Sequence, residues 1–225
     1  MKNLFILISF LLIVNIADAQ YRGRYQGYVT AGVGGGAIIS HMDIVENNIH
    51  PGAAFYFNFH SSYTFMAGLE VQSGLINAGK DKYNRQSKNQ FIATFLKANV
   101  KLFPDADFIQ TILPNLYLGS GVGFIKNNVT DVLPDVSETS DPALAVGWRP
   151  TYSGTDVLIP FNAGIIINFK NGYRRDSNVS LNLNYQNNKS ITDWLDGYSS
   201  IVGGGNLAKD SYSFVSLGLH YRLGR

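Results

Sequence analysis

The 225-residue sequence contains no cysteine. Disulfide bonds are therefore excluded, and so are metal sites built on thiolate ligands. A bacterial lipoprotein is acylated on a cysteine at the cleavage point of its signal peptide, so we expect no lipid anchor. The four histidines show no spacing typical of paired metal ligands. We expect no metal and no cofactor.

Long hydrophobic runs are also absent, apart from one short stretch. Residues 4–14 are apolar except for Ser9, whereas a membrane-spanning helix needs about 20 apolar residues. Lys2 precedes this run, and Ala17-Asp18-Ala19 follows it. A basic start, a short apolar run and a small-x-small motif are typical of a cleaved secretory signal peptide. We expect residues 1–19 to be this signal and residues 20–225 to form one domain; the alternative is a buried N-terminal helix.

Charge is scarce as well, with 15% charged residues and a formal net charge of +2. This balance lacks the basic excess that binds phosphate backbones, which argues against nucleic acid as a partner. Glycine, tyrosine and phenylalanine are abundant instead, with 23, 13 and 14 residues. Membrane barrels combine small residues in the lumen with aromatic girdles at the two interfaces, so the composition fits that class.

Apolar and polar side chains alternate without a fault over residues 178–186, and again over residues 215–223. Successive side chains of a β-strand point to opposite faces, so both segments are predicted strands with one apolar and one polar face. We expect the apolar face to contact lipid and the polar face to line a lumen. Weaker alternation predicts six further strands, at residues 26–39, 52–60, 64–75, 90–103, 115–126 and 157–170.

The predicted links fall into two classes. Those after the even-numbered strands are short, at residues 60–63, 104–114 and 171–177, and the others are mostly longer, at residues 40–51, 77–89, 127–156 and 187–211. Outer-membrane barrels have an even number of strands, short periplasmic turns and long extracellular loops. The sequence therefore predicts an all-β, eight-stranded, antiparallel up-and-down transmembrane β-barrel in a bacterial outer membrane, with both termini periplasmic. A soluble sandwich of the same strands is the alternative.

Two local motifs carry a family resemblance. The spacing of Ser216, Gly218, Tyr221 and Leu223 is similar to the C-terminal signal read by the barrel-assembly machinery. Residues 192–197 with residues 210–212 are similar to the last extracellular loop of Bacteroidota barrels. The chain thus resembles the small OmpA-type outer-membrane barrels, in the Bacteroidota form that includes the secretion-associated barrel PorG.

The resemblance implies contacts with outer-membrane lipid and lipopolysaccharide, use of the assembly machinery, and other envelope proteins as partners. The chain departs from the family at Gly224-Arg225, where an aromatic residue is usual. We expect no peptidoglycan-binding domain, so the cell-wall tethering of full-length OmpA proteins is not carried over.

Charged side chains occupy several positions that the alternation directs into the lumen. Eight strands leave an interior just wide enough for side chains, and buried charges must be paired. We therefore predict a structural ion-pair network that fills the lumen, with a small pore as the alternative. The predicted network consists of Glu70, Lys97, Lys101, His220 and Arg222.

A lipid A-modifying enzyme is a second alternative, because some small barrels hydrolyse acyl chains with a Ser-His-acid set on their outer wall. Such catalysis needs Ser and His within hydrogen-bond reach. His60-Ser61 falls at the expected periplasmic end, and Ser40-His41 falls at the start of an expected loop. The glycines of residues 32–36 lie within a strand, whereas a dinucleotide site needs a following helix. We predict no catalytic residues.

The remaining candidates are surface residues, which favour a structural or interaction component of an envelope complex. Aromatic side chains are enriched at binding hot spots. Two long loops contain Trp148, Tyr152, Trp194 and Tyr198, and an expected periplasmic turn contains Phe108, Ile109 and Ile112. We predict that these seven residues contact partners.

Overall fold

The computed structural model describes residues 27–41, 48–80, 85–103, 115–133, 152–171, 175–192, 195 and 210–223. The predicted signal peptide lies outside them. Within the described residues, no helix is long and apolar enough to cross a membrane. The strands are β1 (Tyr28–His41), β2 (Ile49–His60), β3 (Phe65–Lys80), β4 (Arg85–Lys101), β5 (Leu116–Leu133), β6 (Tyr152–Asn171), β7 (Arg175–Ser190) and β8 (Ser211–Leu223).

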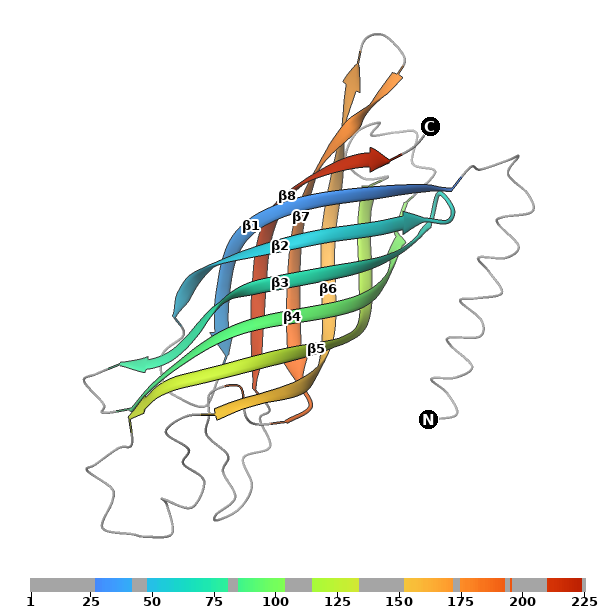
Figure 1. The fold of residues 1–225 in the computed structure, drawn as a ribbon. Helices are drawn as coiled ribbons and strands as arrows, with labels where there is room; N and C mark the ends of the chain where they lie inside the picture. Colours follow the sequence, from blue (N-terminus) through green and yellow to red (C-terminus); the bar gives the residue numbers. More distant parts are fainter. Residues whose placement is uncertain are drawn as a thin grey trace, which may run out of the picture.

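Each strand pairs antiparallel with the next, and β8 closes onto β1 (Figure 1). The sheet is therefore a closed up-and-down barrel, which satisfies every strand edge by pairing. The predicted fold class is confirmed. Closure fixes which side chains share the lumen, because inward positions of all eight strands converge there.

The outer surface of the barrel is apolar, as the alternation predicts. Leu183 is 47% exposed, whereas its neighbour Asn182 is 6% exposed. Soluble proteins rarely expose a continuous apolar surface, while a bilayer requires one around a closed barrel. The exposed apolar side chains come from all eight strands and include Val33, Phe55, Phe57, Leu69, Ile92, Leu96, Leu118, Phe124, Phe161, Leu183, Leu217 and Leu219.

Several strands are longer than the sequence predicts. The β3–β4 ladder continues to the pair Lys80 and Arg85, β5 runs to Leu133, and β6 begins at Tyr152. The predicted links 77–89, 127–156 and 187–211 are therefore longer than the links in the structure. The length rule is also weaker than predicted, because the link 81–84 is shorter than the link 102–115. Only the links 134–151 and 191–210 are long at what we call the long-link end, where β1, β3, β5 and β7 end.

The strands reach beyond the apolar band at the long-link end. At about 3.3 Å per residue and a tilt near 45°, the 20 residues of β6 cover roughly 45 Å along the barrel axis. The apolar band of such barrels is only about 25 Å tall. Outward positions near this end become polar and exposed, as at Gln90, Lys126, Asn128, Thr155 and Lys189. This overhang therefore faces water.

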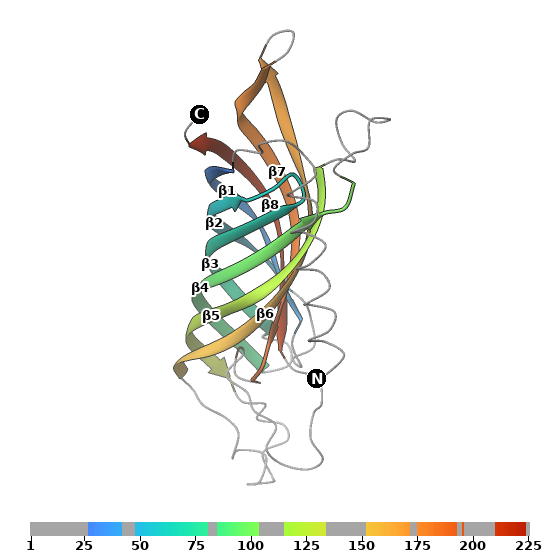
Figure 2. The same cartoon turned by 90° about the vertical axis from the view of Figure 1, so that its right-hand side faces the viewer.

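A second projection lies at the opposite, short-link end. Here β6 and β7 pair out to Asn171 and Arg175, whereas β5 stops pairing with β6 at Ile165 and β8 stops pairing with β7 at Val179. The ends of β6 and β7 thus form a two-stranded hairpin beyond the rim, which Figures 1 and 2 show standing clear of the other strands.

Candidate functional site

The lumen is the site that the fold builds, and its side chains change in character along the barrel axis. An apolar zone lies toward the long-link end, a hydrogen-bonded polar belt lies in the middle, and a cationic cavity lies at the short-link end. Each zone draws on inward positions of several strands.

The apolar zone is a buried cluster inside the barrel. Phe95 and Ile125 are fully buried, and the rings of Phe91 and Tyr212 lie 5.0 Å apart between centroids. The cluster begins within the apolar band, since Phe95 is next to Leu96, which is 62% exposed, and it continues toward the polar overhang. The cluster consists of Ile38, Ala54, Tyr56, Ile76, Phe91, Ala93, Phe95, Ile125, Leu158, Leu195, Tyr212 and Phe214.

Leu195 is the member of this cluster that comes from a link rather than a strand. Its carbonyl accepts a hydrogen bond from Asn89 Nδ2 at 2.8 Å, and its amide donates to Asp210 Oδ2 at 2.9 Å. Nearby, Thr192 Oγ1 donates to Asp156 Oδ1 at 2.7 Å. These bonds fix the fully buried Leu195 side chain within the barrel mouth.

The polar belt connects strands that are not neighbours in the sheet. Glu70 on β3 and Lys97 on β4 form an ion pair, and Lys97 Nζ also donates to Gln186 Oε1 on β7 at 2.9 Å. Gln72 Nε2 donates to Glu70 Oε1 at 2.6 Å. Glu70 and Lys97 are only 1% and 6% exposed, so the hydrogen bonds around the pair offset part of its desolvation.

Two tyrosines complete the belt. Tyr56 Oη on β2 donates to Ser216 Oγ on β8 at 3.0 Å. Tyr117 Oη on β5 lies 3.0 Å from Asn182 Oδ1 and 3.1 Å from Asn184 Oδ1, both on β7. With the Lys97 bonds, these contacts cross the lumen in several directions and occupy its middle with side chains.

The five residues predicted as one charge network lie in two places. Glu70 and Lys97 form the ion pair of the belt, while Arg222 and His220 line the cavity at the short-link end. Lys101 is the last residue of β4 at that end. It follows Lys97 by four positions along the strand, a rise of about 13 Å. Glu70 therefore pairs with Lys97, and the five residues do not form a single network.

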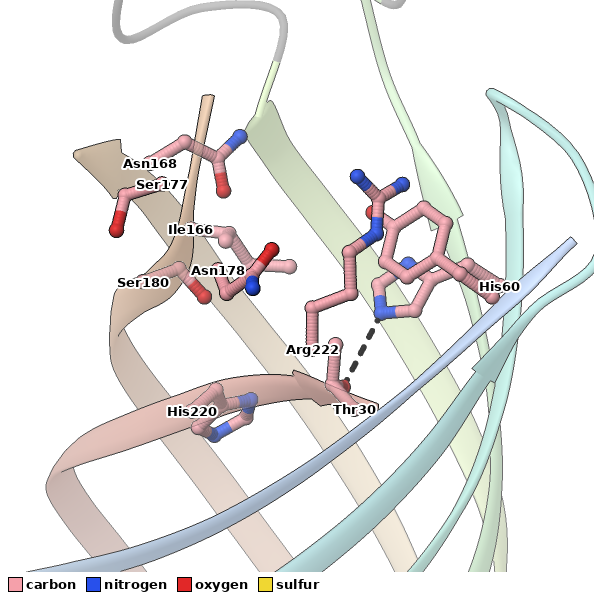
Figure 3. Close-up of a pocket in the computed structure, with 10 residues that line it drawn as sticks. Thr30, His60, Ile166, Asn168, Ser177, Asn178, Ser180, His220 and Arg222 are labelled. Atoms are coloured by element: carbon pink, nitrogen blue, oxygen red, sulfur yellow. Dashed lines mark hydrogen bonds between the residues drawn. The ribbon is translucent and has the colours of Figure 1, made fainter. Parts of the chain in front are cut away.

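The cavity has a volume of about 60 Å³ and two unlike walls. On one wall, the Arg222 guanidinium lies 3.6 Å from the centre of the Tyr28 ring, and Tyr28 stacks on His60 at 4.3 Å between centroids. The other wall consists of amide and hydroxyl side chains of β6 and β7 that face Arg222 and His60 across the cavity (Figure 3). They include Asn168, Ser177, Asn178 and Ser180.

His220 lies deeper in the cavity and is 3% exposed. Its ring is 5.0 Å from that of Tyr56, and its Nε2 has no hydrogen-bond partner among the described residues. Gly32 makes room for this ring, because a Cβ at Gly32 would lie 2.5 Å from His220 Cδ2. The glycine-rich stretch therefore lies within β1 and accommodates lumen side chains.

The four residues of the predicted assembly motif lie on β8 as its spacing requires. Ser216 and Gly218 face the lumen, whereas Tyr221 and Leu223 face outward at 52% and 43% exposure. Their part in assembly stays a prediction.

Most predicted partner residues lie outside the described part of the chain, namely Trp148, Trp194, Tyr198, Phe108, Ile109 and Ile112. Tyr152 is the exception: its predicted place in a loop is wrong, because it begins strand β6, while its contact with a partner stays a prediction. The error arose where polar residues follow on both faces, so the alternation that marks a strand is lost.

Ser40 and His41, which were weighed as a possible catalytic pair, lie on strand β1 and not at a loop start. Ser40 is buried and points inward, whereas His41 is exposed on the outer face, as neighbours on a strand must be. The structure instead places His41 Nε2 3.0 Å from Ser213 Oγ, a contact between residues 172 positions apart that sequence reasoning missed. Among the described residues, no three His, Asp or Glu side chains group as metal ligands.

Fold and lumen together define the class as a small transmembrane β-barrel with a filled interior. No protein-family model matches the chain, and no curated protein sequence matches it. Similar solved structures include Ail, the attachment invasion locus protein of Yersinia pestis, in complex with the heparin analogue sucrose octasulfate. Its identity is 10% and its TM-score 0.48, over 88% of this chain and 100% of that one.

Neisserial surface protein A is similar at 9% identity and a TM-score of 0.46, with the same coverage. The translocator domain of autotransporter NalP from Neisseria meningitidis reaches 10% identity and a TM-score of 0.36, over 99% and 97% of the two chains. At these values we base no functional argument on the similarities.

Proposed function

We propose that the protein is an integral barrel of a bacterial outer membrane that neither conducts nor catalyses, and that serves as a structural or interaction component of an envelope complex. The observation that carries this proposal is the filled lumen. A pore needs a continuous water-filled path, but hydrogen bonds across the belt and the apolar zone beyond it occupy the interior of this barrel.

The proposal includes an orientation. The long-link end carries the polar overhang and the longest links, as the extracellular end of such barrels does. Both termini are then periplasmic, the outer wall contacts lipid and lipopolysaccharide, and β8 presents its motif to the assembly machinery. The finer assignment, a Bacteroidota barrel of the PorG kind in a secretion-associated complex, rests on the sequence resemblance.

Planar-bilayer recording tests the closed lumen. The purified barrel should give no steady openings, while a large porin recorded in the same membrane gives them. A double variant, Phe95→Ala with Leu158→Ala, removes two fully buried side chains of the apolar zone and should admit more current than wild type. Steady large openings of the wild-type protein would move the assignment to a channel.

The interaction role needs a separate experiment, affinity purification from detergent-solubilised outer membranes. A defined complex should co-purify with the wild-type barrel. The double variant Trp148→Ala, Trp194→Ala should fold normally and retain less partner, because both residues belong to the long links. A matched variant on the lipid-facing wall, Phe161→Leu, should retain the partner. A barrel that always purifies alone would contradict this role.

One contact favours a second candidate function, acyl hydrolysis at the outer wall. Ser213 Oγ lies within hydrogen-bond distance of His41 Nε2, Tyr185 Oη and Asn187 Nδ2, as a nucleophile with a base and two further groups would. Ser213 is only 1% exposed, and no described carboxylate hydrogen-bonds to His41. Mass spectrometry of lipid A decides the matter: acyl loss that disappears in Ser213→Ala would establish the enzyme.

A further inference from the structure

The cationic cavity at the short-link end has no part in the function proposed above. Its lining side chains come from several strands, which only barrel closure brings together, and Arg222 is the cation among those described. Arg222 lies on β8 and lines the cavity with His60 of β2, and Lys101 ends β4 at the same end.

No described side chain balances these charges. None of the described lining residues is acidic, and the ion pair formed by the described carboxylates is that of Glu70 with Lys97, deeper in the barrel. A positive cavity with low-dielectric walls concentrates counter-ions, because nearby protein strengthens each charge. The charge pattern thus points to an anion as the occupant.

The donors suit an oxyanion in particular. Arg222 stacks its guanidinium face on Tyr28, which leaves the N–H groups at its edge available for two oxygens of one ligand. The facing wall offers the Asn168 amide and the Ser180 hydroxyl, and His220 Nε2 is buried without a described partner. Hydrogen-bond donors on opposite walls can surround a tetrahedral or trigonal anion.

The size of the cavity fits the same class. One water molecule needs about 10–15 Å³ of such a cavity, so a volume of about 60 Å³ holds roughly four to six atoms of that size. Phosphate has five. We propose that this cavity is a binding site for a phosphate-sized oxyanion, held by Arg222 against the amide and hydroxyl wall of β6 and β7 (Figure 3) and attracted also by the positive charge of Lys101 at the same end of the barrel.

The histidines allow a direct test by NMR. His60 and His220 line the cavity, whereas His41 and His50 lie at the other end of the barrel. In histidine-labelled protein folded in uncharged detergent, inorganic phosphate at constant pH and ionic strength should shift only the His60 and His220 ring signals. Sodium chloride should not. A parallel titration with glycerol 3-phosphate distinguishes the source, since tighter binding than phosphate indicates an organic phosphate and weaker binding indicates the free ion.

Three variants test whether phosphate binding depends on the positive charges at the cavity. Arg222→Gln should weaken phosphate binding by at least about tenfold, because it removes the charge-assisted hydrogen bonds of the guanidinium. Lys101→Gln supplies a second, independent loss if the first variant folds poorly. Lys126→Gln removes the same charge at an exposed outward position and should bind as wild type does. Shifts of all four histidines together, no saturable shift, or equal binding by Arg222→Gln and wild type would overturn the proposal.

Discussion

Removing one partner of the buried ion pair should destabilise the barrel strongly. In Lys97→Met, the Glu70 carboxylate keeps the Gln72 amide as a hydrogen-bond donor but loses its cation. Glu70 is only 1% exposed, so water cannot replace that cation. Breaking a buried pair in this way costs about 3–5 kcal/mol, because the remaining charge stays desolvated. The double variant Glu70→Gln, Lys97→Met leaves no buried charge and should recover most of that loss.

The assay is reversible urea unfolding of the detergent-folded barrel, followed by circular dichroism and by heat-dependent gel mobility. Wild type, Glu70→Gln, Lys97→Met and the double variant form a double-mutant cycle, from which we expect a coupling energy of at least about 2 kcal/mol. Lys189→Met makes the same substitution at an exposed outward position and should change the unfolding free energy by less than about 0.5 kcal/mol. Additive single effects, with coupling near zero, would refute the reasoning.

Two further predictions concern neighbouring positions that face opposite ways. Leu183→Arg places a charge on the lipid face and should lower the unfolding free energy by about 2–4 kcal/mol in unfolding titrations. Asn182→Ala on the lumen face should lower it by no more than about 1–2 kcal/mol. Similar losses of stability in the two variants would mean that the two faces were misassigned. Gly36→Ala puts a Cβ 1.9 Å from the Val215 carbonyl oxygen and should cost about 1–3 kcal/mol. Gly35→Ala meets no atom closer than 3.6 Å and should be neutral in the same titration, and equal effects would remove the steric explanation.

The sequence predicted the barrel because lipid and lumen impose a strict two-residue period. On β7 and β8, every predicted direction agrees with the structure, from Leu183 and Leu217 outward to Asn184 and Ser216 inward. The pattern is reliable there because both environments are continuous along the strand, so a register error would expose a whole set of side chains to the wrong solvent.

The same period failed at the long-link end. Residues Lys126, Asn127 and Asn128 are polar on both faces, so nothing in them marks a strand, yet β5 pairs with β4 and β6 through this region. The ladder persists because main-chain hydrogen bonding does not depend on side-chain polarity. Ile125 points inward between the outward residues Phe124 and Lys126, so the alternation of polarity is lost there as well.

The contacts within the lumen could not be predicted from the sequence, for a geometric reason. Alternation directs Lys97 and Lys101 into the same lumen, but strand stagger and tilt decide which of them reaches Glu70. The cavity depends on closure in the same way, since Tyr28 and Arg222 become neighbours only when β8 pairs with β1. The pairing of His41 with Ser213 has the same origin.

The order of the zones along the axis decides what an anion in the cavity could do. Beyond the cavity lie the hydrogen-bonded belt, in which Lys97 is already paired, and then the apolar zone. Moving an ion onward would require it to break the contacts of the belt and then to enter an apolar interior, where an unpaired charge is prohibitively costly. An anion that enters at the short-link end must therefore leave by the same end. The closed lumen and the cationic cavity are thus compatible, and together they favour retention of a ligand over its transport.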